Sequence, residues 1–211
     1  MAIALREWRL FGSQVADDPP GAGPPRSAAS MPERAPGLWQ RVGEYWWLGE
    51  DAGNPTAAWT GKHDETGAEF PVSEDARYAW SAAFVSYVMR IAGAGPRFPY
   101  SASHSTYINA ARSGGYALTA ERPEEYAPLP GDILCATRTR SKRPRFEDLP
   151  AGPFPSHCAI VVGGDDATIA VIGGNIEDAV ALTHVPADGT GRIAADPRYS
   201  WFVILKVAYA R

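Results

Sequence analysis

The chain has only two cysteines and no long apolar run. Cys135 and Cys158 are too few to define a disulfide framework, and each lies in an apolar, strand-like stretch, so we expect free, buried thiols. The N-terminal stretch 1–10 is interrupted by three charged side chains, which is unlike a signal-peptide core or a membrane span. The sequence therefore predicts a soluble protein without its own export signal and without a membrane span.

The chain also has no excess of positive charge: its formal net charge at pH 7 is −4. This balance argues against binding of nucleic acid or of an anionic membrane through a general basic surface. The one basic run, residues 138–145, contains Pro144 and is typical of a solvated loop. No nucleic-acid partner is expected.

The 211 residues suffice for one sizeable core, preceded by an extension. Residues 1–36 form this predicted extension, a short amphipathic helix over 2–15 followed by a strap rich in proline and glycine. Ala4, Trp8 and Phe11 share one face of that helix, which favours packing against the rest of the protein. Residues 37–211 form the predicted main domain.

Helical patterns come first along the chain and strand patterns follow. Apolar spacing predicts helices from Leu38 to Trp46, from Tyr78 to Gly93 and from His104 to Arg112. Five short, often β-branched runs predict strands: Asp132–Thr137, Cys158–Val162, Thr168–Ile172, Ala179–Val185 and Trp201–Val207. This order is typical of an α+β fold with N-terminal helices packed on an antiparallel sheet of about five strands.

The helix from Tyr78 to Gly93 carries the first candidate for chemistry. Its apolar stripe, projected backwards, places Ser81 in the first turn on the inward face. First-turn side chains lie among unpaired backbone N–H groups at the positive end of the helix dipole, where a developing anion is favoured. Ser81 is therefore a candidate nucleophile, although a serine at the start of an ordinary core helix is the commoner case.

Two further polar residues fall at strand ends. His157 opens one predicted strand, and Asn175 ends the next, after Gly173 and Gly174. If the two strands are antiparallel neighbours, His157 can lie beside Asn175, whose amide would orient the imidazole. Cys158 points to the face opposite His157, which argues against a thiol nucleophile there.

Four motifs in one order carry a family resemblance over about Tyr78 to Val207. They are Trp-Ser-Ala-Ala-Phe-Val, Pro-Gly-Asp-Ile-Leu, His-Cys-Ala-Ile-Val-Val-Gly and Ile-Gly-Gly-Asn-Ile-Glu-Asp-Ala-Val. This order resembles the NlpC-type and CHAP peptidoglycan amidase/endopeptidase superfamily, which is papain-like, and especially its phage-type members and a bacterial family of unknown function with Ser in the nucleophile place. The resemblance implies an NlpC/CHAP fold in which a helix-start nucleophile, a strand-start His and a polar orienter cleave an amide bond.

Carried onto this chain, the resemblance implies that Ser81 attacks, His157 is the base and Asn175 orients it. The superfamily has Cys at the position of Ser81, and a hydroxyl is far less acidic than a thiol. Ser81 is then a working nucleophile, the remnant of an inactive binding site, or an engineered replacement of Cys. We rank the first ahead, because His157 and Asn175 are both retained.

The implied substrate is the stem peptide of peptidoglycan, cleaved by an endopeptidase or an N-acetylmuramoyl-L-alanine amidase. The alternative is an inactive papain-like module that binds a cell-wall peptide or a protein partner. Tyr78, Trp80 and His104 are candidate substrate-binding residues near Ser81, and no cofactor or metal is implied. A cell-wall substrate requires delivery from the bacterial cytoplasm to the periplasm or cell wall, as a phage lysin or a secreted effector, and a delivered toxin implies a cognate inhibitor protein.

Overall fold

Four α-helices precede the sheet in the computed structural model, which describes residues 1–19, 27, 30–51, 53–138 and 144–209. They are α1 (Ala2–Leu10), α2 (Leu38–Gly49), α3 (Ser81–Ile91) and α4 (His104–Ser113). Each lies where apolar spacing predicts a helix. Within this described part, no helix is long and apolar enough to cross a membrane. Parts of the predicted strap (20–26 and 28–29) and of the basic run (139–143) lie outside the described residues.

The strands form one six-stranded antiparallel sheet in the described part of the chain. They are β1 (Leu118–Glu121), β2 (Ile133–Thr137), β3 (Ser156–Gly164), β4 (Thr168–Ile176), β5 (Ala179–Pro186) and β6 (Ser200–Val207), in the spatial order β1-β6-β2-β3-β4-β5. The α+β class is confirmed. The predicted count of about five strands missed β1, because its four residues are too few for a clear pattern and only pairing with β6 defines them.

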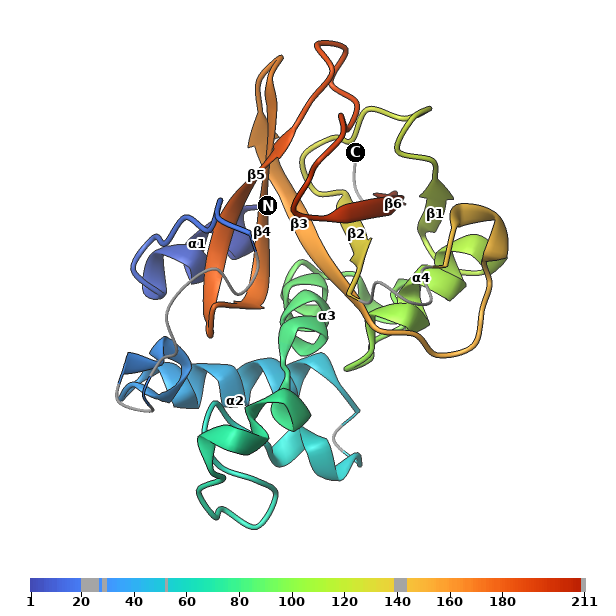
Figure 1. Cartoon of the computed structure of the whole chain (residues 1–211). Coiled ribbons are helices and arrows are strands. Elements are labelled where there is room, and N and C mark those ends of the chain that lie inside the picture. The colour runs from blue at the N-terminus through green and yellow to red at the C-terminus, as the bar shows by residue number, and fades with distance from the viewer. Residues whose placement is uncertain (20–26, 28–29, 52, 139–143, 210–211) are drawn as a thin grey trace.

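Helix α3 lies at the centre of the molecule, between α2 and the sheet (Figure 1). Its first nine residues, Ser81 to Met89, are all buried, so it is a core helix rather than a surface helix. Gly174 in β4 permits the close approach, since a Cβ there would lie 2.6 Å from Phe84 and 2.7 Å from Trp80. The start of α3 is therefore pressed against the end of β4.

The N-terminal extension joins the same core. Helix α1 lies beside β4 and β5 (Figure 1), with Ala4 and Phe11 buried as predicted. The chain then runs along β5, where Ala16 N donates to Leu182 O (2.8 Å) and Leu182 N donates to Gln14 O (3.0 Å). The extension thus continues the hydrogen bonding of the sheet at its β5 edge.

The two cysteines form a disulfide, so the expectation of free thiols is wrong. Cys135 in β2 and Cys158 in β3 are directly opposite in the antiparallel register, with their Cα atoms 4.1 Å apart. The strand patterns showed that both cysteines are buried, but they did not show the register that pairs them. The disulfide is enclosed in the core between the helices and the sheet.

Candidate functional site

Ser81 is the first residue of α3, as predicted, and its side chain is 3% exposed. The preceding residue, Trp80, is the N-cap and makes no side-chain capping hydrogen bond to the helix. The N–H groups of the first turn have no partner within the helix, so they are available to an anion near Ser81. The site thus begins at a helix end with the polarity that a nucleophile needs.

His104, not His157, lies within hydrogen-bond distance of Ser81. Its Nε2 is 2.8 Å from Ser81 Oγ, and its Nδ1 is hydrogen-bonded to Tyr107 Oη. His104 is the first residue of α4 and Tyr107 follows one turn later, so both side chains lie on the same face of that helix. Burial lowers the pKa of His104 well below 6.5, with His157 and Arg138 lowering it further, and burial raises that of Tyr107 well above 10. The ring is therefore neutral at pH 7 and the phenol is protonated.

His157 lies next to His104, with the ring centroids 5.5 Å apart. Its side chain is 7% exposed, and neither ring nitrogen has a hydrogen-bond partner among the described residues. Burial, together with the nearby charge of Arg138, lowers the pKa of His157 to about 3. A buried imidazole with both nitrogens unpaired by protein groups is uncommon, and these nitrogens can hydrogen-bond to a group that enters the site.

The predicted hydrogen bond between Asn175 and His157 is not formed in the described structure. Asn175 Nδ2 instead donates to Glu33 Oε2, at 3.2 Å, and Glu33 also accepts from Trp80 Nε1. The backbone of Asn175 has φ 55°, which departs from the extended conformation of the strand, and its side-chain amide bonds to Glu33 rather than to the imidazole. His157 does lie against β4, because a Cβ on Gly173 would be 2.8 Å from its Nε2.

Trp80 and Tyr78 were predicted to bind substrate, and the structure places both in the core. Trp80 is 1% exposed and packs on Phe11 and Tyr45. Tyr78 stacks on Phe70, with ring centroids 3.7 Å apart. Tyr78 is also only 5% exposed, so neither ring presents an open surface to substrate. Of the three predicted binding residues, only His104 reaches Ser81.

Two residues of the site, Tyr107 and Glu33, were not predicted from the sequence. Tyr107 could have been predicted, because a residue three positions after His104 on a predicted helix lies on the same face of that helix. Glu33 could not have been predicted, since it lies at the end of the predicted strap and reaches the site only through the tertiary contact with Asn175. Among the described residues, no group of three or more His, Cys, Asp or Glu side chains is placed to hold a metal ion.

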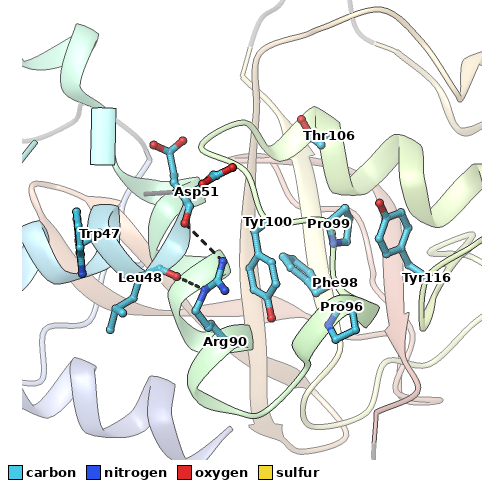
Figure 2. Close-up of a pocket in the computed structure, with 11 residues that line it drawn as sticks. Trp47, Leu48, Asp51, Arg90, Pro96, Phe98, Pro99, Tyr100, Thr106 and Tyr116 are labelled. Atoms are coloured by element: carbon cyan, nitrogen blue, oxygen red, sulfur yellow. Dashed lines mark hydrogen bonds between the residues drawn. The ribbon is translucent and has the colours of Figure 1, made fainter. Parts of the chain in front are cut away.

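A separate open pocket of about 710 Å³ lies near the other end of α3 (Figure 2). Arg90 stands in it, 3.8 Å from the centroid of the Tyr100 ring, and donates to the backbone oxygen of Leu48. Trp47 and Tyr116 line opposite sides of the pocket (Figure 2). Neither Ser81 nor either histidine of the site lines it, so the pocket is distinct from the Ser81 site.

Ser81, His104 and Tyr107 form a hydrogen-bonded chain of a hydroxyl, an imidazole and a phenol, an arrangement that could serve as nucleophile, base and orienter. Comparison with curated proteins and with solved structures finds no match. Comparison with protein families finds one match, over residues 33–207, to the model described as "Uncharacterized protein conserved in bacteria (DUF2272)". Because this match spans most of the 211 residues and includes every residue of the site, the chain belongs to that bacterial family.

Proposed function

We propose that the protein is a papain-like amide-bond hydrolase that cleaves the stem peptide of bacterial peptidoglycan. The observation that carries the chemistry is the 2.8 Å contact between Ser81 Oγ and His104 Nε2 at the start of α3. A serine needs a base at this distance, because its hydroxyl must lose the proton as it attacks. The cell-wall substrate rests on the order of the four sequence motifs.

In this mechanism, Ser81 Oγ attacks the scissile carbonyl carbon while His104 Nε2 takes its proton. The mechanism requires the tautomer in which His104 Nδ1–H donates to Tyr107 Oη, which leaves Nε2 free to accept a proton. The first-turn N–H groups of α3 stabilise the oxyanion of the tetrahedral intermediate. His104 then protonates the leaving amine, and water hydrolyses the acyl–enzyme ester by the reverse proton path.

His157 has a different role in this arrangement from the one that the resemblance implied. Its ring nitrogens have no partner among the described residues, so they remain available to a substrate. It therefore hydrogen-bonds to the substrate amide beside His104. The papain-like fold is supported by a helix-start nucleophile packed on an antiparallel sheet, with the histidine at the start of β3 and the amide near the end of β4.

The disulfide supports action outside the reducing cytoplasm. Disulfides form and persist in oxidising compartments such as the periplasm, and Cys135–Cys158 is part of the core. Delivery of the protein to the periplasm or cell wall, as a secreted effector or phage lysin, agrees with a peptidoglycan substrate. A cognate inhibitor protein would then protect the cell that produces it.

Digestion of purified muropeptides, followed by mass spectrometry, tests the proposal. The wild type should release stem-peptide fragments or free stem peptide. Ser81→Ala and His104→Gln should both reduce release to background, whereas Ser81→Cys should keep activity because a thiol is the better nucleophile. Ser86→Ala is the matched control, a buried serine of α3 that bonds to Ser101 O instead of a histidine. Equal product from wild type and Ser81→Ala would remove Ser81 as the nucleophile.

Burial of the site favours one other candidate, an inactive module that binds a cell-wall peptide or a protein. Ser81, His104 and His157 are only 3%, 5% and 7% exposed, so a substrate reaches them only if the covering residues move. A binding module needs no such access. Retention of the protein on purified sacculi, without any released fragment, would favour this candidate over hydrolysis.

A further inference from the structure

Glu33 is a buried carboxylate held by two neutral donors. Its side chain lies beneath the surface, with the residue 3% exposed, and its Oε2 accepts from Trp80 Nε1 and from Asn175 Nδ2. An isolated buried charge is costly, and no described Lys or Arg side chain donates a hydrogen bond to this carboxylate. A carboxylate in such a place, close to a candidate site, is a candidate for a functional role.

The backbone around Glu33 is held firmly in place. Glu33 N donates to Asp178 O at 2.9 Å, and a Cβ on Gly61 would lie 2.0 Å from Glu33 O, so another backbone segment packs directly against it. The next residue, Arg34, binds Asp75 at 2.6 Å and the backbone oxygen of Phe70 at 3.0 Å. The backbone that carries the carboxylate is therefore fixed independently of the two donors.

Both donors belong to segments that carry the site. Trp80 directly precedes Ser81 at the start of α3. Asn175 lies two residues after Gly173, whose Cα faces Nε2 of His157. Asn175 has φ 55°, in the left-handed region that asparagine adopts more readily than most residues, at the point where β4 leaves the extended conformation.

We infer that Glu33 is a positioning residue. Through one carboxylate oxygen, which accepts from both Trp80 and Asn175, it sets the start of α3 against the end of β4. This places Ser81, together with its hydrogen-bond partner His104, against His157. We call Glu33, Trp80 and Asn175 the Glu33 bridge. The inference rests on the proposed function only in so far as the positioned groups are catalytic.

The Glu33 bridge responds to pH in the neutral range. Burial raises the pKa of Glu33 to about 7; the Trp80 bond and Arg34 lower it, while Asp178 and Asp75 raise it. These are the charged groups that face the carboxyl from the segments packed against it. Above pH 7 the carboxylate is charged and is the stronger acceptor for both donors. Below pH 7 it is protonated, and the two bonds weaken.

Nuclear magnetic resonance can follow this titration without any assumption about activity. The indole N–H of Trp80, assigned with Trp80→Phe, should shift between pH 5.5 and 8.5 with a midpoint near 7. Glu33→Gln should abolish the shift and keep the hydrogen bond, because the amide oxygen still accepts. Trp59 is an internal control: it donates to the exposed Glu65, whose pKa is held below 4.5 by backbone hydrogen bonds and by Trp59 itself, so its resonance should not move in this range.

The ring resonances of His157 report whether the site follows the Glu33 bridge. Since the pKa of His157 is about 3, its own ionisation contributes nothing between pH 5.5 and 8.5. A shift of His157 that parallels that of Trp80 and disappears in Glu33→Gln supports the inference. A Trp80 resonance that stays still, a shift that survives in Glu33→Gln, or a Trp80 shift without a His157 shift would overturn it.

An activity measurement separates the inference from the proposed function. If muropeptides are cleaved, the pH profile of kcat in Glu33→Gln should lose the transition near pH 7, with KM little changed. A kcat profile identical to that of the wild type would contradict a positioning role. If no muropeptide is cleaved, the proposed function fails, and the resonance shifts still decide whether Glu33 positions the site.

Discussion

Two imidazole rings lie side by side in this site, and only one has hydrogen-bond partners among the described residues. His104 is held by Ser81 on one side and by Tyr107 on the other, whereas both nitrogens of His157 are unpaired. Burial lowers the pKa of each ring, and for His104 a charge on His157 would lower it further. The pair is therefore neutral at pH 7.

Gly173 is a residue whose missing side chain makes room for His157. We expect Gly173→Ala to reduce the free energy of unfolding by about 1–3 kcal/mol, because its Cβ would lie 2.8 Å from both His157 Nε2 and Ile176 Cδ1. Urea denaturation measures this loss. Gly163→Ala is the control, since a Cβ at that position in β3 meets nothing within 4 Å. Equal effects of the two substitutions would mean that His157 does not press on Gly173.

At the scale of single residues, the sequence predicted which side chains carry polarity but only partly which ones meet. Ser81 is at a helix start and His157 at a strand start, because apolar periodicity marks both positions. The partner of Ser81 was not predictable in the same way. His104 is 23 residues away on another helix, and the tertiary placement of α4 beside the sheet decides the contact.

At the scale of elements, the disulfide joins two neighbouring strands, β2 and β3. It lies one residue from His157, so it ties the strand that carries this ring to the middle of the sheet. The antiparallel register places Cys135 opposite Cys158 and Ala136 opposite His157. A strand pattern alone leaves this register open, since a shift by two residues keeps the same side chains on the same face.

Loss of this cross-link should destabilise the protein. The cysteines are 23 residues apart, and a cross-link that closes a loop of this length should contribute about 3 kcal/mol to the free energy of unfolding. We expect the double variant Cys135→Ala, Cys158→Ala to show this loss in urea denaturation. In the unfolded wild type, iodoacetamide should label neither cysteine until a reductant is added. Labelling of both without reductant would show that the thiols are free.

At the scale of the whole molecule, one buried carboxylate attaches the N-terminal helix to the rest of the protein. Glu7 is fully buried and accepts from Arg41 at 2.6 and 2.7 Å, from Arg6 at 2.8 Å and from Tyr45 at 2.8 Å. Burial raises its pKa, but these hydrogen bonds outweigh burial, and the net pKa is lowered from 4.5. The stability that Glu7 contributes is therefore present above pH 4.5 and is lost as the pH falls through the lower pKa of the folded state.

Removal of this carboxylate should loosen α1. We expect Glu7→Ala to reduce the free energy of unfolding by about 3–5 kcal/mol at pH 7, because it leaves Arg41 and Tyr45 without their buried partner. Glu44→Ala is the matched control: Glu44 binds the same Arg41 but is 54% exposed, so a change within about 0.5 kcal/mol is expected. Denaturation at pH 7 compares them, and similar losses in both would contradict the buried network.

Local patterns in the sequence were sufficient to determine the α+β class, the helices, most of the strands and the position of Ser81 in a first turn. Such features depend on periodicity and on residues a few positions apart. Only the tertiary structure decided that His104 meets Ser81, that Cys135 bonds Cys158 and that Glu33 takes Asn175 away from His157. These contacts join residues 23 to 142 positions apart, and sheet register and helix packing place them together, which no local pattern records.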